Sequence, residues 1–363
     1  MMTQNINKSW QWYNNTPAFL DEMYISCSKA TKSILLEQYI IKNDQVGRKF
    51  LKILTKKAKQ GVKVAILCDW IGGIDLWNSP LIKVLIQNGG KFYFYNSIRQ
   101  WHPFKITTWF TRDHRKILLI DSQIVFIGGF CLDQRMYNWH DLVIKLSSEL
   151  ICNDIKYYFE LLFNENISNK KRNLTTFSPI TENGFKCLVN NAKRHEKYLY
   201  QALLEQIKQA RNYIYLVTPY FIPEENFFQS LKEAVTRKVE IVLLIPESSH
   251  IKLIDYITFH YYIKAIQAKI KIFQFKDQLL HAKYAIIDDE WAMVGSMNFD
   301  YLSLMKSNEL SLVITNHQAI VELKNLHCVD LMHSKELSIN ELYQKPLWQK
   351  IIGLLGLIFK KLL

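Results

Sequence analysis

Two separate segments of the 363-residue chain carry the same polar residues at the same spacing. The segments are 114–129, HRKILLIDSQIVFIGG, and 281–296, HAKYAIIDDEWAMVGS. The shared positions are His114, Lys116, Asp121 and Gly128 in the first copy and His281, Lys283, Asp288 and Gly295 in the second. At about 5% average usage per residue type, four fixed positions recur by chance in roughly one chain per several hundred. The repetition therefore indicates a duplicated functional site.

The histidines and lysines of this repeat can together transfer a phosphoryl group. Residues i and i+2 of a β-strand project from one face, so each histidine is expected beside its lysine. One neutral imidazole can attack phosphorus while the other, protonated, gives its proton to the leaving alkoxide. We therefore predict that His114 and His281 are catalytic. Lys116 and Lys283 would neutralise the non-bridging phosphate oxygens in a partly desolvated site, so the chemistry requires no metal or other cofactor.

Further polar residues near the repeat are candidates for holding the substrate and the histidines. Ser296 and Asn298 end the second copy, and we expect them to donate hydrogen bonds to the phosphate oxygens. A nucleophilic histidine also needs an acceptor at its other ring nitrogen, which fixes its tautomer. Asp141 and Glu309 stand at matching distances after the two histidines, and we predict that they are these orienting carboxylates.

The repeated aspartates, Asp121 and Asp288, have two open interpretations. Both fall at a polar turn between two short apolar strands, where a carboxylate commonly caps the turn. Direct participation in catalysis is the alternative. Turn capping is favoured, and both residues stay among the catalytic candidates.

The elements that must position these residues are themselves duplicated. Residues 33–70 and 213–246 each show an apolar strand, an amphipathic helix and a second apolar strand, which is typical of a parallel βαβ unit. The histidine-containing segments each show two short strands around a turn. The sequence therefore predicts an α/β fold of two lobes related by a pseudo-twofold axis. Each lobe is expected to be a mixed, mostly parallel sheet flanked by helices, with the site shared between the lobes.

The same pattern places the boundaries of the lobes. The first lobe is expected over 1–163 and the second over 185–333, with a polar linker over 164–184 and an amphipathic tail over 334–363. Near the ends of the chain the longest apolar run, 351–359, is far shorter than the ~20 residues that cross a bilayer. We expect the protein to be soluble or to lie on a membrane rather than to span one.

Composition and charge narrow the class of partner. With 49% hydrophobic and 22% charged residues, the composition excludes a disordered or collagen-like chain. The six cysteines are scattered and form no CxxC pair, which disfavours structural zinc or a disulfide framework. The 46 basic and 33 acidic residues give a net charge of +13, which attracts nucleic acids and anionic bilayers alike.

The repeated His-x-Lys-x4-Asp pattern resembles the HKD signature of the phospholipase D superfamily. The stretches that resemble bacterial cardiolipin synthases of the phospholipase D type are 37–64, 112–117, 281–314 and 346–363. The resemblance implies a phosphatidyltransferase: one phosphatidylglycerol is attacked, glycerol leaves, and a phosphatidyl-histidine forms. The hydroxyl of a second phosphatidylglycerol then attacks to give cardiolipin.

The resemblance also implies roles for the histidines. His114 would be the nucleophile and His281 the general acid, later the base, although the symmetry of the two motifs leaves the reverse assignment open. Gly129 and Cys131 depart from the family, which commonly has Ser and Asn at these positions. The departure puts in doubt whether the first half supplies oxygen-binding side chains beyond Lys116.

Two peripheral segments fit a lipid substrate. Residues 99–110 interleave aromatic and basic side chains, and residues 347–363 alternate apolar residues with lysines. A packed loop over the site is the alternative for the first segment, and packing against the second lobe is the alternative for the second. With phosphatidylglycerol as the partner, we expect a peripheral protein on the cytoplasmic face of the bacterial cell membrane.

Two other classes of protein remain open at this point. One is a metal-independent HKD-family phosphodiesterase, either a nuclease with nucleic acid as its partner or a phospholipid hydrolase. The other is an inactive relative that docks on anionic membranes.

Overall fold

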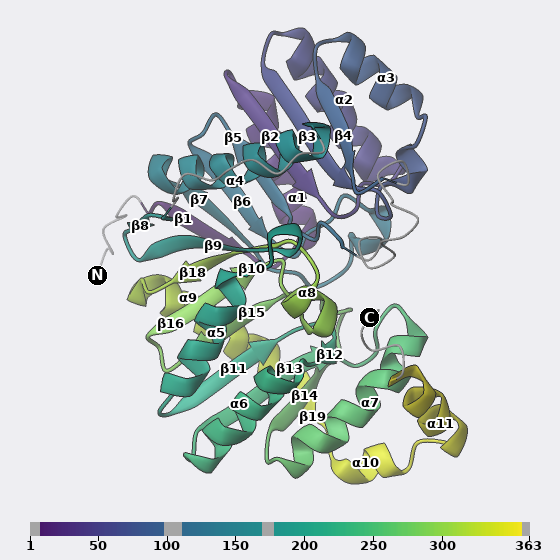
Figure 1. Ribbon diagram of the computed structural model, residues 1–363, viewed down its shortest axis with the longest axis vertical. Coiled ribbons are helices and arrows are strands. Elements are labelled where there is room, and N and C mark those ends of the chain that lie inside the picture. The colour runs from purple at the N-terminus through teal and green to yellow at the C-terminus, as the bar shows by residue number, and fades with distance from the viewer. Residues whose placement is uncertain (1–7, 98–110, 169–177, 358–363) are drawn as a thin grey trace.

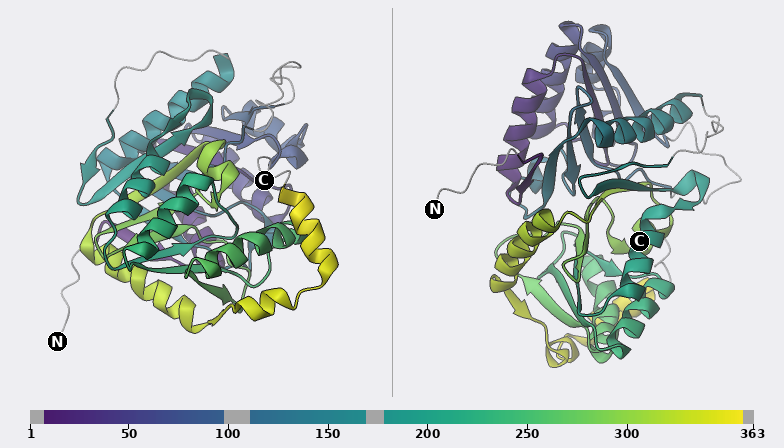
Figure 2. Two further views of the ribbon diagram at one scale, coloured as in Figure 1. Left: turned by 60° about the horizontal axis from the view of Figure 1, so that its bottom comes forward. Right: turned by 90° about the vertical axis from the view of Figure 1, so that its left-hand side faces the viewer.

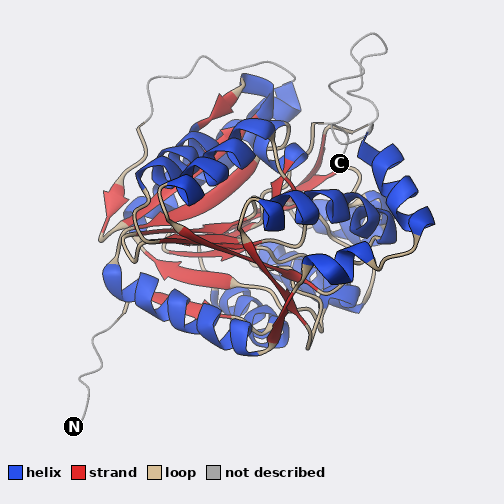
Figure 3. Cartoon of the chain, turned by 90° about the horizontal axis from the view of Figure 1, so that it is seen from below, coloured by secondary structure: helices blue, strands red, loops and turns tan. Residues whose placement is uncertain are grey.

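The computed structural model describes residues 8–97, 111–168 and 178–357, which form two α/β lobes that lie one above the other in Figure 1. The N-terminal lobe holds a seven-stranded sheet and the C-terminal lobe a ten-stranded sheet, each flanked by helices (Figures 1 and 2). Seen from below, strands run through the middle of the molecule and helices lie around them (Figure 3). The α/β fold of two lobes that the repeats predict is confirmed.

The first sheet has the strand order β1-β7-β6-β5-β2-β3-β4. Its strands are β1 (Trp10–Tyr13), β2 (Ser33–Gln38), β3 (Lys63–Asp69), β4 (Lys91–Tyr95), β5 (Ile117–Ile120), β6 (Ile124–Gly128) and β7 (Val143–Ser147). Its helices are α1 (Thr16–Lys29), α2 (Gln45–Lys59), α3 (Pro80–Gln87) and α4 (Glu149–Ser168).

The second sheet has the order β10-β9-β18-β16-β15-β11-β13-β14-β19, with β8 beside β9. Its strands are β8 (Thr181–Glu182), β9 (Phe185–Asn191), β10 (Glu196–Lys197), β11 (Tyr213–Val217), β13 (Glu240–Pro246), β14 (Lys271–Phe275), β15 (Tyr284–Ile287), β16 (Trp291–Gly295), β18 (Glu309–Ile314) and β19 (Ser334–Glu336). The helices are α5 (Tyr198–Gln209), α6 (Glu225–Thr236), α7 (Lys252–Gln267), α8 (Tyr301–Met305), α9 (His317–Met332), α10 (Ile339–Tyr343) and α11 (Leu347–Gly356). Strands β12 (Phe221–Ile222) and β17 (Phe299–Asp300) form a separate pair.

The two sheets repeat one plan strand by strand. The order β9-β18-β16-β15-β11-β13-β14 matches β1-β7-β6-β5-β2-β3-β4, and equivalent helices join equivalent strands. Among the described strands of this plan, those joined by a helical crossover, β2-β3-β4 and β11-β13-β14, pair in parallel. The remaining pairs of the plan are antiparallel. The expectation of mostly parallel sheets is therefore wrong, because the motif hairpins and their return strands add more pairs than the crossovers do.

Helix α2 shows why the βαβ units form. Asp44 caps its N-terminus by accepting a hydrogen bond from the Gly47 amide at 3.0 Å. Its buried residues, such as Phe50 and Leu54, recur at helical spacing and pack in the core with the strands of the first sheet. The equivalent helix α6 is capped by Glu224 and buries one face in the same manner.

A single apolar core crosses the boundary between the lobes. It contains residues of β5, β6 and β7 from the first lobe, of β9, β15, β16 and β18 from the second, and of helices α4 and α9. Two further cores, one in each lobe, fill the space between each sheet and its other helices. The shared core therefore holds the motif strands β5 and β15 together in one packed unit.

The C-terminal segment packs on the second lobe. Strand β19 pairs with β14, and α11 lies along α7 (Figure 1). Gly353 permits this close approach, because a Cβ at that position would lie 2.1 Å from the carbonyl oxygen of Tyr256. Within the described part of the chain, no helix combines the length and the apolar character that crossing a membrane would require.

Candidate active site

Each motif histidine lies just before the first strand of its hairpin, where the main chain pairs with the other lobe. Asp113, next to His114, forms a parallel bridge with Asn308, and the residue before His281 forms one with His140. The His114 amide donates to the Asn308 carbonyl at 3.0 Å, and the His281 amide donates to the His140 carbonyl at 2.7 Å. Both histidine backbones are therefore held by a segment of the opposite lobe.

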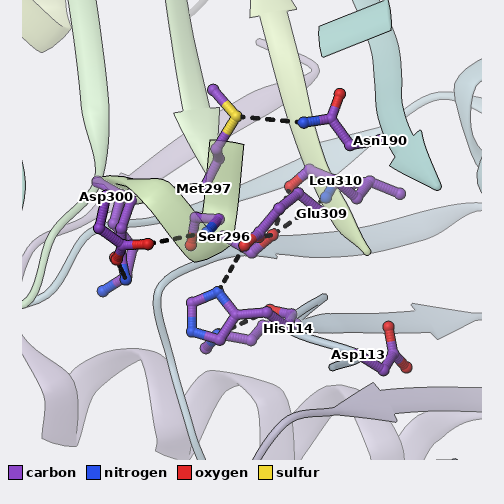
Figure 4. Close-up of polar contacts among 12 residues, drawn as sticks. Asp113, His114, Asn190, Ser296, Met297, Asp300, Glu309 and Leu310 are labelled. Carbon is purple, nitrogen blue, oxygen red and sulfur yellow. Dashed lines mark hydrogen bonds and ion pairs between the residues drawn. The ribbon is translucent and has the colours of Figure 1, made fainter. Parts of the chain in front are cut away.

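The same segments supply a carboxylate to each imidazole. Nδ1 of His114 lies 2.9 Å from Oε1 of Glu309, and Nδ1 of His281 lies 2.7 Å from Oδ2 of Asp141. Figure 4 shows the first contact, with Glu309 above the His114 ring. The matching distances along the sequence do not reveal that each carboxylate contacts the histidine of the other lobe. This arrangement leaves Nε2 of each ring as the atom that can attack phosphorus or carry a proton.

Both imidazoles line one cavity of about 240 Å³. Its lining residues come from both lobes and include Tyr39, His114, Lys116, Cys131, Tyr220, His250, His281 and Asn298. Nζ of Lys116 donates to the carbonyl of His114 at 2.8 Å, and Nζ of Lys283 donates to the carbonyl of His281. The structure thus brings His114, Lys116 and His281 to one cavity, whereas Lys283 is absent from the described residues that line it.

Burial and neighbouring charges set the protonation of this site. Burial lowers the pKa of His114, and burial together with Lys283 lowers the pKa of His281 to about 3. Burial and the Lys116 charge lower the pKa of Lys283 to about 7. Although burial raises the pKa of Asp141 and Glu309, the adjacent histidines and lysines hold it below its usual value in both. The site therefore sets neutral imidazoles against ionised carboxylates, and a phosphate anion would favour protonation of a ring.

Aromatic side chains flank both imidazoles, and the motif does not reveal them. The ring centroid of Tyr39 lies 5.0 Å from that of His114, with the rings edge to face. The ring centroid of Trp139 lies 5.3 Å from that of His281. Both come from the first lobe, and Tyr39 directly follows the buried strand β2. That position at the end of a core strand is the signal that could have identified it.

A third histidine also reaches the cavity. His250 lines it, and Nδ1 of His250 lies 2.9 Å from the hydroxyl of Tyr220. Its ring centroid is 5.1 Å from that of Trp139. In the sequence His250 stands outside any motif, so no pattern indicates a role for it.

The two residues expected to bind phosphate oxygens occupy different places. The hydroxyl of Ser296 donates to Glu309 and accepts from the Leu310 amide at 3.0 Å (Figure 4). Asn298 lines the cavity, and its amide donates to Asp300 at 2.9 Å. Its Oδ1 atom is buried and lacks a hydrogen-bond partner among the described residues. We infer that Ser296 positions Glu309, whereas Asn298 stays a candidate for contact with the substrate.

The repeated aspartates lie at the hairpin turns. The Asp121 carboxylate accepts from the main-chain amides of residues 31–33, and Asp288 accepts from those of 211–213. Each aspartate thereby ties its turn to the start of the neighbouring strand, β2 or β11. Among the described residues that line the cavity, neither aspartate is present. Of the two roles considered, we therefore propose turn capping for both.

The segments expected at a membrane are described in part. Residues 99–110 lie outside the described residues. Of 347–363, helix α11 and Leu357 are described. The apolar residues Leu347, Trp348, Ile351, Leu354 and Leu355 of α11 are exposed.

Sequence comparison gives a consistent set of relatives. The family described as "Cardiolipin synthase, PLD-like domain" matches residues 24–163 and 203–327. A cardiolipin synthase of Clostridium perfringens is 27% identical over 97% of this chain and 77% of its own length. A cardiolipin synthase of Staphylococcus aureus is 28% identical over 93% of this chain and 70% of its own length.

Solved structures share the fold at low sequence identity. A phosphatidylserine synthase of Haemophilus influenzae matches 98% of this chain and 95% of its own with a TM-score of 0.80 at 12% identity. A polyphosphate kinase of Porphyromonas gingivalis matches 97% of this chain and 53% of its own with a TM-score of 0.63 at 15% identity. At these identities the likeness establishes the fold alone.

Proposed function

Because the chain belongs to the family of cardiolipin synthases with PLD-like domains, we propose that it is a phosphatidyltransferase that condenses two phosphatidylglycerol molecules to cardiolipin and glycerol. The observation that carries the proposal is the pair of histidines around one cavity, each bound at Nδ1 by a carboxylate of the other lobe. The names of its relatives support cardiolipin as the product, and phosphatidylglycerol is the substrate that the resemblance implies.

The first half of the proposed reaction forms a covalent intermediate. Nε2 of His114 attacks phosphorus of one phosphatidylglycerol, and the bond from phosphorus to the glycerol oxygen breaks. His281 gives its Nε2 proton to that oxygen, and free glycerol leaves. Glu309 stabilises the positive charge that develops on the His114 ring. The low pKa of His281 means that it acquires its proton when the negative phosphate enters the cavity.

The second half reverses the proton transfer with a new alcohol. His281 takes a proton from the hydroxyl of the second phosphatidylglycerol, and the resulting oxygen attacks phosphorus. The bond between phosphorus and Nε2 of His114 breaks, which releases cardiolipin and restores the neutral imidazole. Lys116 and Lys283 neutralise the non-bridging oxygens in both halves.

Helix α11 supports contact with a lipid surface. Its exposed apolar residues recur at helical spacing and form one stripe, while Gly353 and Gly356 pack against α7 on the other side. Ile251 and Ile254, at the start of α7, line the catalytic cavity. An exposed apolar stripe suits a helix that lies in the headgroup region, and the net charge of +13 favours an anionic bilayer. We propose that the protein lies peripherally on the cytoplasmic face of the bacterial cell membrane.

Incubation with labelled phosphatidylglycerol vesicles in EDTA, followed by lipid chromatography, tests the activity. Labelled cardiolipin with release of glycerol is the expected result. Phosphatidic acid would instead identify a hydrolase, and no lipid product together with cleavage of plasmid DNA would identify a nuclease. Absence of every product would leave a membrane-docking protein without turnover.

Vesicle flotation tests the membrane contact. L354E/L355E places two charges on the α11 stripe and should lower recovery with anionic vesicles severalfold. I86E, which alters an equally exposed residue on α3 of the first lobe, is the matched control and should float like the unchanged protein. Equal flotation of both variants would remove α11 from the membrane contact.

A further inference from the structure

A cluster of buried charges lies behind His114 and has no counterpart behind His281. Glu37 on β2 and Asp113 are fully buried, and Arg115 is 1% exposed. Asp113 and Arg115 flank His114 in sequence, so their side chains project from the face of the chain opposite the imidazole. Figure 4 shows the Asp113 carboxylate pointing away from the His114 ring.

The matching strands identify the equivalent residues of the second lobe. Glu37 pairs with Ile117, three residues after His114, and Val217 pairs with Tyr284, three residues after His281. Val217 is thus equivalent to Glu37. The residues that flank His281 are Leu280 and Ala282, and with Val217 they lie in the shared apolar core.

This difference shows that the fold itself does not need the charges. Replacing a buried ion cluster by apolar residues of similar size is often neutral or stabilising, because charges lose hydration when they are buried. The second lobe already has apolar residues at all three positions of the same architecture. The cluster therefore requires an explanation other than stability.

The contacts of Arg115 connect the cluster to the catalytic pair. Nη1 of Arg115 lies 3.7 Å from Oε1 of Glu37, and Nη2 donates to the carbonyl of Asn190 at 3.3 Å. Asn190 on β9 is the register partner of Glu309 on β18. Glu309 in turn holds Nδ1 of His114. Arg115 thus joins the strand of the histidine to the strand beside its carboxylate, across the lobe boundary.

The charges of the cluster balance if its carboxyl groups hold one proton. The charges of Glu37 and Asp113 interact, and none of their four buried carboxyl oxygens has a hydrogen-bond donor among the described residues. A proton held by one carboxyl group would let that group donate a hydrogen bond to the other. Burial raises the pKa of both groups. The singly protonated pair carries one negative charge, which Arg115 neutralises, while Asp69 and Arg112 form their own ion pair at 3.1 Å.

We propose that Glu37, Asp113 and Arg115 form a buried positioning unit that fixes the His114–Glu309 pair across the lobe boundary, with one proton shared by the two carboxyl groups. The part of this proposal that concerns turnover rests on the proposed phosphatidyltransferase function. Other ionisable groups that face the unit are Cys68 and Asp69 on β3, Tyr95 on β4, Arg112 and Lys116 beside His114, Tyr158 on α4 and Cys187 on β9.

Grafting the residues of the second lobe tests the positioning role. E37V/D113L/R115A should fold, since the second lobe accommodates the same residues, although the cavity left by the large buried Arg115 side chain lowers the thermal midpoint. Its kcat for cardiolipin formation should fall by about tenfold to a hundredfold at unchanged KM, because Arg115 no longer holds the His114 segment to the strand beside Glu309. D154N, which alters a buried carboxyl outside the unit, is the matched control and should keep the unchanged protein's kcat. A folded graft with unaltered kcat would overturn the proposal.

A second variant and a titration keep the proposal testable if the graft does not fold. R115Q cannot reach both Glu37 and Asn190, and the same fall in kcat at unchanged KM is expected. Histidine NMR of D113N should show the pKa of His114 within about 0.3 unit of that in the unchanged protein, because the unit keeps one negative charge. A fall of about one unit would mean that both carboxyls are ionised, and would overturn the shared proton. This titration does not depend on turnover, so absence of cardiolipin from the unchanged protein would refute the proposed function separately.

Discussion

The two half-sites share a histidine and a lysine but differ in the residues that support them. Glu309 is accompanied by Ser296, whose hydroxyl donates to it, whereas Asp141 is accompanied by Gly129. A Cβ at Gly129 would lie 2.3 Å from Oδ1 of Asp141. The Asp141 carboxylate therefore occupies the space that a serine side chain at position 129 would fill. Gly129, which departs from the family pattern, leaves the space that the Asp141 carboxylate occupies.

The half-sites differ again behind the histidines. The residues behind His114 are charged, and those behind His281 are apolar. Each lobe thus brings a histidine to the cavity, and the two histidines are supported by different means. This difference gives a physical basis for unlike roles of the two histidines, which the symmetric motifs do not provide.

The largest expected effect is loss of either histidine. H114A and H281A should each lower cardiolipin formation by at least about 10⁴-fold, because nucleophile and proton donor act as one unit. Circular dichroism and the thermal midpoint should stay near those of the unchanged protein. Substantial turnover by both variants would refute the mechanism.

Loss of an orienting carboxylate should have a smaller effect that differs between the half-sites. E309Q and D141N should each lower kcat by about a hundredfold, since the ring keeps its place but loses charge stabilisation. A phosphatidyl donor with a p-nitrophenol leaving group needs no proton from His281. With this donor the first step should recover in D141N and not in E309Q, and equal behaviour of the two variants would make the histidine roles interchangeable.

Substitutions at positions 129 and 141 test whether the residue at position 129 must match the length of the carboxylate at position 141. G129S should lower kcat by about tenfold, because the new side chain displaces the Asp141 carboxylate. G129S/D141E recreates the serine–glutamate pair of the other half-site and should restore most of the loss. A double variant that is no better than G129S would show that the match between positions 129 and 141 has no effect on rate.

The smallest expected effect is proton uptake when an anion binds. His281 has a pKa of about 3 and Lys283 of about 7, and an anion between them raises both values. Binding of sulfate, whose own charge does not change near neutral pH, should therefore take up to about one proton and weaken as pH rises. Calorimetry in buffers of different ionisation enthalpy measures the uptake, which should be smaller in H281N. Release of protons on binding would contradict the assigned charges.

Sequence patterns predict the parts of this structure that depend on residues close together in the sequence. The βαβ units and motif hairpins follow from apolar periodicity, and duplication of the pattern predicts two lobes. Strand direction is harder, because β1 and β7 lie together although α1 to β6 separate them in the chain. The mostly parallel sheets were for that reason a wrong expectation.

The same limit applies to the site. Asp141 and Glu309 can be singled out by their matching places, but the crossing of each to the other lobe depends on how the lobes pack. The cluster of Glu37, Asp113 and Arg115 is hidden for the same reason, since its members meet only after β2 and β5 pair. Trp139 carries no motif, and its contact with His281 arises at the lobe boundary.

Trapping the covalent intermediate identifies the histidine that attacks phosphorus. H281A is mixed with the p-nitrophenyl phosphatidyl donor and quenched in base, where phosphohistidine survives, and its peptides are mapped by mass spectrometry. A phosphatidyl group is expected on His114 in this variant, and none is expected on His281 in H114A. An adduct on His281 in H114A alone would exchange the two roles. Turnover of phosphatidylglycerol by the unchanged protein without an adduct on either histidine would contradict the account.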